Sequence, residues 1–224
     1  MDWSEVWALF IPLIFLFKFK KQPSYLFPIV IFIFISLYVN FLIDLSWKGK
    51  HAFNFPDWFK VNTYFYNALS IIRFLLFSLF FIKLSQPAHS LIIKVILALF
   101  LIFVIINFSF FEKFVNYWYD VNGKLKATLS SKLLTVESIG MLFYCIRYYF
   151  NKLQEDKSES TRPPDFWVVT GLSIYYVSSF LIFLFYQSLL KYSQPFAVLI
   201  WKIPDITFLI LCIFIAKSFT FKHG

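Results

Sequence analysis

The chain has 224 residues, of which 60% are hydrophobic and 15% charged, and its formal net charge is +9 at pH 7. A typical soluble domain is about 45–50% apolar and about 25% charged, so this composition excludes that class. The basic residues mostly flank apolar segments, which favours a lipid bilayer over nucleic acid as the partner of this charge.

Several apolar runs are long enough to cross a bilayer, which takes about 20 residues of helix. Inside a bilayer each segment has to satisfy its own backbone polar groups, so we expect these spans to be helices. The sequence therefore predicts one all-α domain over 1–224, a polytopic transmembrane helix bundle with seven spans. They run roughly over 4–19, 24–45, 62–84, 88–111, 127–150, 165–190 and 196–218.

The first span is short in strictly apolar residues, but the sequence KFKKQP that follows is typical of a membrane exit and a turn. Its three lysines favour the cytoplasmic side, and the first helix often sets the orientation. We therefore expect the N-terminus outside and the C-terminus in the cytoplasm. Asp2 and Glu5 stand where a signal peptide would carry positive charge, so no signal peptide is expected.

The third span contains the sequence SIIRFLLFSLFF (70–81), which places Arg73 near mid-depth among apolar side chains. An arginine at that depth costs at least about 2.5–3.5 kcal/mol unless it is paired. Asn67 and Ser70 precede it at intervals of three residues, a spacing that predicts one polar helix face.

The fifth span carries Glu137, also near mid-depth, with Tyr144 seven residues further on. Two polar stripes at matching depth are expected to face each other or to line a shared cavity. We predict an ion pair between Arg73 and Glu137, or one wet cavity that both line. The sequence leaves three interpretations open: a structural pair that fixes helix register, a ligand or ion site, and unrelated positions.

The last span begins near WKIPD, where Lys202 and Asp205 stand three residues apart. Pro204 removes a helix hydrogen bond and frees the carbonyl of Ile200. In several transporters, an interrupted helix beside charged side chains forms an ion-binding site. The alternative is that Lys202 only extends to the outer interface. A retinal Schiff base is disfavoured, because the acid follows this shallow lysine instead of preceding it.

Other motifs of chemistry are missing from the sequence. The three histidines, His51, His89 and His223, do not have the spacing of metal ligands. There is no P-loop, no GxGxxG and no His-Glu-x-x-His motif. We therefore expect no metal, no cofactor and no enzymatic activity.

The region around the start of the sixth span reads RPPDFWVVTGLSIYYVSSFLIFLF (162–185). Asp165 is placed to cap a helix. Gly171 and Ser178 form a small-residue stripe that favours close approach of another helix.

Two further stretches add to this pattern, VNTYFYNALSIIRFLLFSLFFIKL (61–84) and VESIGMLFYCIRYYFNKL (136–153). Together the three resemble a family of uncharacterised seven-helix membrane proteins of Bacteroidetes, and the resemblance covers most of 60–190. The family often carries a His-Asn pair after the tryptophan of its last helix, where this chain has Pro204 and Asp205. The resemblance implies an inner-membrane protein that accompanies signalling proteins such as histidine kinases.

The expected function is that of a receptor or sensor. A ligand or lipid would bind among the outer halves of the helices, and loop 151–164 with the C-terminal tail would report to a cytoplasmic signalling protein. The alternative is an oligomeric pore, channel or transporter that uses the buried charges as a permeation path. The sequence leaves the oligomeric state open. The candidate site residues are Asn67, Ser70, Arg73, Glu137, Tyr144, Lys202 and Asp205.

Overall fold

Helices run through most of the computed structural model, which describes residues 4–19, 22–49, 62–85, 87–115, 117–119, 125–127, 129–154 and 163–221. The helical expectation is therefore confirmed. The helices are α1 (Ser4–Lys18), α2 (Phe27–Gly49), α4 (Thr63–Leu84), α5 (Pro87–Ile106), α6 (Ser131–Gln154), α7 (Pro164–Tyr192), α8 (Gln194–Ile200) and α9 (Lys202–Phe219). A 3-10 turn, η1 (Ser24–Leu26), leads into α2, and a π-helical turn, η2 (Asn107–Phe111), extends α5.

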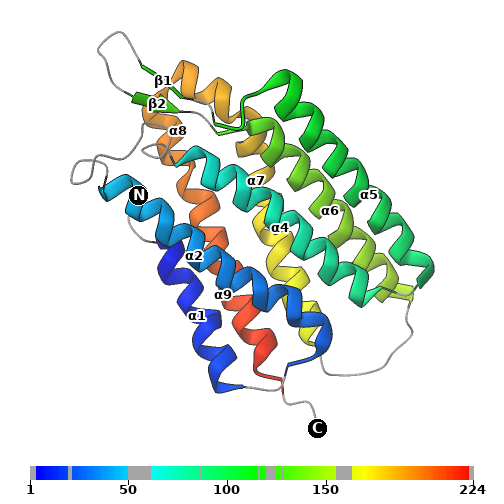
Figure 1. The fold of residues 1–224 in the computed structure, drawn as a ribbon. Helices are drawn as coiled ribbons and strands as arrows, with labels where there is room; N and C mark the ends of the chain where they lie inside the picture. Colours follow the sequence, from blue (N-terminus) through cyan, green and yellow to red (C-terminus); the bar gives the residue numbers. More distant parts are fainter. Residues whose placement is uncertain are drawn as a thin grey trace.

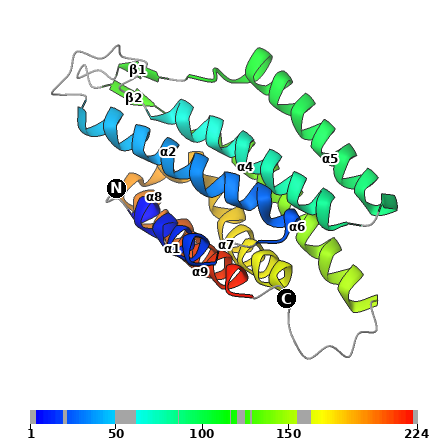
Figure 2. The same cartoon turned by 60° about the horizontal axis from the view of Figure 1, so that its bottom comes forward.

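The long helices form a closed ring. In the order α1, α2, α4, α6, α7 and α9 each helix packs on the next, and α9 returns to α1. Helix α5 lies outside this ring against α4 and α6 (Figure 1). Figure 2 shows α5 at the edge of the bundle, on the side away from α1 and α9.

Five segments are long and apolar enough to cross a membrane: Ser24–Leu45, Thr63–Leu84, Ser90–Phe111, Pro164–Leu190 and Pro195–Phe219. The apolar part of α1, Val6–Lys18, is shorter than these, and α6 is more polar. The sequence placed the fifth span over 127–150, whereas α6 begins at Ser131 and continues to Gln154. Its start is set by Ser130, whose Oγ accepts a hydrogen bond of 3.1 Å from the backbone N–H of Leu133. This is the N-cap geometry that ends the preceding loop.

A short hairpin departs from the all-α expectation. Strand β1 (Tyr117–Tyr119) pairs antiparallel with β2 (Leu125–Ala127). Five residues separate the strands, and in the sequence they include Asn122 and Gly123, residue types that are common in turns. The hairpin lies at the same end of the bundle as α8 (Figure 1).

The last predicted span is broken into two helices. Trp201 separates α8 from α9, and its backbone N–H still reaches the carbonyl of Ala197 at 3.1 Å. Pro204, in the first turn of α9, has no N–H to give to Ile200, so the break falls where the sequence predicted it.

The close approach of α7 and α9 depends on a glycine. A Cβ on Gly171 would lie 2.8 Å from the Cβ of Phe214 and 3.0 Å from Cδ1 of Leu211. No larger residue fits there without moving α9, which supports the small-residue stripe predicted for this helix.

Candidate functional site

The predicted ion pair is present at the centre of the ring. The Nε of Arg73, on α4, lies 2.5 Å from Oε1 of Glu137, on α6, and Nη2 donates to Oε2 at 2.9 Å. Two parallel bonds between a guanidinium and a carboxylate are the strongest arrangement open to these groups. The pair therefore joins two helices that are 64 residues apart in sequence.

Three more side chains complete this network. The hydroxyl of Ser70 donates to Oε2 of Glu137, and the hydroxyl of Tyr176 donates to Oε1 at 2.6 Å. Nη1 of Arg73 donates to the hydroxyl of Tyr175 at 3.2 Å. The guanidinium carbon also lies 5.5 Å and 6.0 Å from the centres of the Tyr175 and Tyr176 rings, within the range of a cation–π interaction. The network thus ties α7 to α4 and α6.

Burial explains why so many donors gather here. Glu137 is 0% exposed and Arg73 is 8% exposed. Removing two charges from water costs several kcal/mol per ion, roughly, unless other hydrogen bonds satisfy the remaining oxygens and N–H groups. Each oxygen of Glu137 has two donors, so the carboxylate is fully satisfied, whereas two of the five guanidinium N–H groups have no bond within the network.

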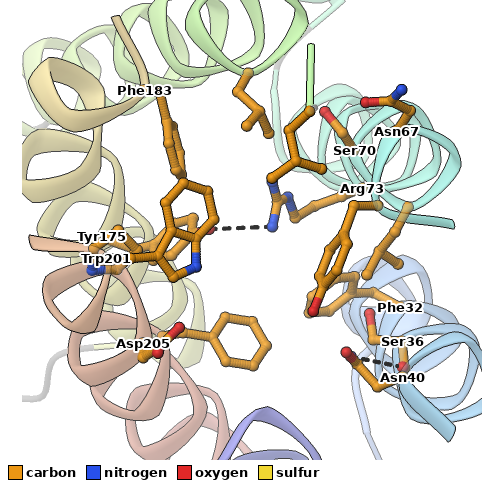
Figure 3. A pocket seen from close by; sticks show the side chains of 16 residues that line it. Phe32, Ser36, Asn40, Asn67, Ser70, Arg73, Tyr175, Phe183, Trp201 and Asp205 are labelled. Carbon is orange, nitrogen blue, oxygen red and sulfur yellow. Dashed lines mark hydrogen bonds between the residues drawn. The ribbon is translucent and has the colours of Figure 1, made fainter. Parts of the chain in front are cut away.

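A pocket of about 50 Å³ adjoins the exposed side of this pair (Figure 3). Arg73 points into it from α4, and Asp205 lies across it on α9. On α2, Nδ2 of Asn40 donates to the backbone carbonyl of Ser36 at 2.9 Å. The buried hydroxyl of Ser36 has no hydrogen-bond partner among the described residues. The lining residues are Phe32, Ser36, Asn40, Tyr66, Asn67, Leu69, Ser70, Arg73, Leu129, Leu134, Tyr175, Phe183, Trp201, Pro204, Asp205 and Phe208.

This pocket combines opposite charges, unused donors and an aromatic wall. A volume of about 50 Å³ accommodates a few water molecules or a very small polar solute, since a water needs at least about 10–15 Å³ on this measure. Arg73 offers N–H groups on one side and Asp205 a carboxylate on the other. Phe183 and Trp201, with ring centres 5.7 Å apart, cover the side nearer α8. The pocket can therefore hold a polar ligand in a fixed orientation.

Two of the predicted site residues have other structural roles. Asn67 lines the pocket but does not join the Arg73 network. Its Nδ2 donates a hydrogen bond to the backbone carbonyl of Phe114 at 3.1 Å, and its Oδ1 accepts one from the backbone N–H of Ser130 at 3.4 Å. Tyr144 lies away from the pair. Its hydroxyl donates to the carbonyl of Ile93 at 3.2 Å.

The two charges of the WKIPD sequence also separate. Lys202 is exposed and does not line the pocket, whereas Asp205 does. Among the described residues no ion pair joins them, and the exposed Lys202 agrees with the alternative in which it only extends to the interface.

Sequence reasoning missed the tyrosines of α7. Tyr175 and Tyr176 are adjacent, so they project from different parts of the α7 surface, and yet both reach the ion pair. With 13 tyrosines in the chain, nothing in their type marks these two. Their place near the middle of an apolar run is the one signal that separates them from interfacial tyrosines.

A second polar contact joins α6 and α7 at the end opposite the hairpin. The hydroxyl of Tyr148 donates to Oδ2 of Asp165 at 2.7 Å, and Asp165 is 5% exposed. The expectation that Asp165 caps α7 is wrong, because Pro163 holds the N-cap position and no side chain bonds there. Asp165 instead turns inward to Tyr148.

Within the described ranges no group of three His, Cys, Asp or Glu side chains is placed to hold a metal ion. Cys145 and Cys212 are both buried. Comparison with protein-family models, with curated proteins and with solved structures finds no match to this chain.

Proposed function

We propose that this chain is a multi-pass inner-membrane protein of the receptor or sensor type, with no enzymatic activity of its own. Seven helical spans place the N-terminus outside and the C-terminus in the cytoplasm. A small polar ligand binds in the pocket beside Arg73 and changes how α7 and α9 pack. The resemblance to seven-helix proteins of Bacteroidetes is consistent with this proposal and stays a prediction.

The exposed surface of α6 supports its place among the spans. Its buried polar residues, Glu137 and Ser138 among them, face the ring, while Ile139, Phe143, Ile146 and Phe150 are 43–62% exposed and recur every three or four residues. An apolar stripe on the outside of a helix with a polar inner face fits contact with lipid. The overall apolarity of α6 is low because its inner face carries Glu137, Ser138 and their neighbours.

The observation that carries the receptor proposal is the pocket itself. Arg73 is held by Glu137 and Tyr175 and still has N–H groups to offer on the pocket side. The wall of the pocket includes residues of α2, α4, α7 and α9. A ligand that contacts Arg73 and Asp205 together therefore bridges opposite sides of the ring. Such a ligand favours whichever packing brings the two walls to the right distance.

A route to the cytoplasmic end runs along α6 and α7. Glu137 and Tyr176 join these helices at the pair, and Tyr148 and Asp165 join them near the other end. A shift of α7 at the pocket therefore changes a buried hydrogen bond close to loop 151–164. Most of that loop (155–162) and the last residues of the C-terminal tail (222–224), which we propose as the docking elements, lie outside the described residues.

The rival is a pore or transporter. Along α4 the residues between Arg73 and Phe81 include three phenylalanines that are 0% exposed, Phe74, Phe77 and Phe80. A permeation path along α4 would have to open this packed layer. The layer favours the receptor proposal over an open channel.

The first experiment is purification of the full chain from its native host in mild detergent, followed by native mass spectrometry. We expect a monomer or dimer that carries a soluble signalling protein in fixed stoichiometry. Asp205→Asn should change the yield or activity of that partner, and Lys202→Gln, a neighbouring charge outside the pocket, should not. A homo-oligomer of five or more copies with no partner would overturn the receptor proposal in favour of a pore.

A further inference from the structure

A second pocket lies at the end of the bundle opposite the hairpin. Its volume is about 280 Å³, and it lies between the last turns of α4 and α6 and the first half of α5. The mechanism proposed above does not use it. Its lining residues are of two kinds, apolar side chains at the inner part and polar or basic side chains at the outer part.

The polar part centres on Arg147. Its Nε is buried and has no hydrogen-bond partner among the described residues. Lys152 lines the same pocket one and a half turns further along α6, and its Nζ lies 5.9 Å from the centre of the Tyr148 ring. Ser85 and Asn151 add small polar groups to this part of the wall. An anion placed here would meet two cations and at least one buried N–H without a partner.

The apolar part reaches deeper into the bundle. Phe81 and Ile93 are each 2% exposed, and with Leu84 they line the pocket beside Tyr144. From Tyr144 to Gln154, which both line it, α6 rises about 15 Å. A pocket with a basic outer part and an apolar inner part matches a phosphate joined to hydrocarbon.

Among the described residues, Asp165 is an acidic group that contacts a residue of this wall, Tyr148. It does not line the pocket, and its Oδ2 is bonded to the hydroxyl of Tyr148. The described lining residues include two cations, Arg147 and Lys152, and no acidic side chain.

We infer that this pocket binds the phosphate of an anionic glycerophospholipid, with Arg147 and Lys152 on the phosphate and Phe81, Leu84 and Ile93 against the glycerol and first acyl carbons. In the proposed orientation this end faces the cytoplasm, where basic pockets between helices recognise anionic headgroups. The inference rests on the proposed membrane placement but not on a receptor role.

The test uses the purified full chain in a non-ionic detergent, with native mass spectrometry to measure bound dioctanoyl-phosphatidylglycerol. We expect one tightly bound lipid per chain, and about 25-fold weaker binding for Arg147→Gln/Lys152→Gln, since each charge contributes roughly fivefold. Lys83→Gln, which removes a cation at the same end outside the pocket, is the matched control and should bind like the unsubstituted chain. Equal binding by the double variant and the control would overturn the inference.

Two further binding measurements use the unsubstituted chain, so their outcome does not depend on whether a variant folds. Dioctanoyl-phosphatidylcholine should bind at least about tenfold more weakly than the phosphatidylglycerol. Inorganic phosphate should displace the bound lipid only at far higher concentration, because it lacks the apolar contacts. Equal affinity for the two lipids, or displacement by phosphate at matched concentration, would contradict a lipid site. Loss of lipid binding would leave the partner experiment above unaffected, so the two proposals fail separately.

Discussion

Glu137 receives the Nε of Arg73 and the hydroxyl of Tyr176 on the same carboxylate oxygen, at 2.5 Å and 2.6 Å. Three helices therefore meet at one buried atom. The arrangement makes each partner costly to remove by itself.

Arg73→Met and Glu137→Met should each lower the free energy of unfolding by about 3–5 kcal/mol, because each leaves an uncompensated buried charge. The double variant should be more stable than the sum of the two losses predicts, since it leaves neither charge. Chemical unfolding of the full chain in detergent micelles measures all four species. Strict additivity would show that the two side chains act independently, which contradicts the ion pair.

Tyr176→Phe and Tyr175→Phe form a matched pair on α7. The first removes a donor to a fully buried carboxylate and should cost about 1–3 kcal/mol. The second removes an acceptor for Nη1 of Arg73, which borders the pocket, so its cost should be smaller, about 0.5–1 kcal/mol. The same unfolding measurement compares the two. A larger loss for Tyr175→Phe would reverse the assignment of which tyrosine stabilises the pair.

Gly171→Ala should lower the free energy of unfolding by about 1–3 kcal/mol, because its Cβ would lie 2.8 Å from the Cβ of Phe214 and force α7 and α9 apart. Ser178→Ala, on the same helix, is the control. Its hydroxyl bonds only the carbonyl of Ile174, four residues earlier in α7, so its loss should change stability by less than about 0.5 kcal/mol. Equal effects of the two changes would indicate that the helices do not approach as closely at Gly171 as described.

The proposed orientation can be tested by labelling with a membrane-impermeant maleimide. Ser193→Cys, between α7 and α8, should react in intact cells, whereas Thr220→Cys, after α9, should react only after permeabilisation. The native Cys145 and Cys212 are buried and serve as the unlabelled background. Labelling of both engineered cysteines from the same side would exclude a crossing by α8 and α9.

The ion pair was predictable because charges are scarce inside the spans. Arg73 and Glu137 both lie near mid-depth in apolar runs, where few other side chains could form an ion pair with either of them. Ser70, one turn from Arg73, followed from the same reasoning. The sequence contained no comparable signal for the tyrosines of α7, which are uncharged and one kind among many aromatic residues.

Helix geometry explains why two of the predicted residues fall outside the network. Six residues separate Asn67 from Arg73, which turns the helix by about 600° and leaves the side chains about 120° apart. Seven residues bring Tyr144 back to the face of Glu137, but they move it about 10.5 Å along α6. Asn67 therefore reaches Phe114 and Ser130, and Tyr144 reaches the second pocket.

The low apolarity of α6 has a consequence for biosynthesis. A helix whose polar face carries Glu137 has little tendency to leave the translocon for lipid by itself. Its partner Arg73 is made 64 residues earlier, on α4. We expect a chain truncated after α6 to integrate that helix when α4 is intact and to leave it outside the bilayer when Arg73 is replaced. Insertion of the fifth span would then depend on a helix that has already been inserted.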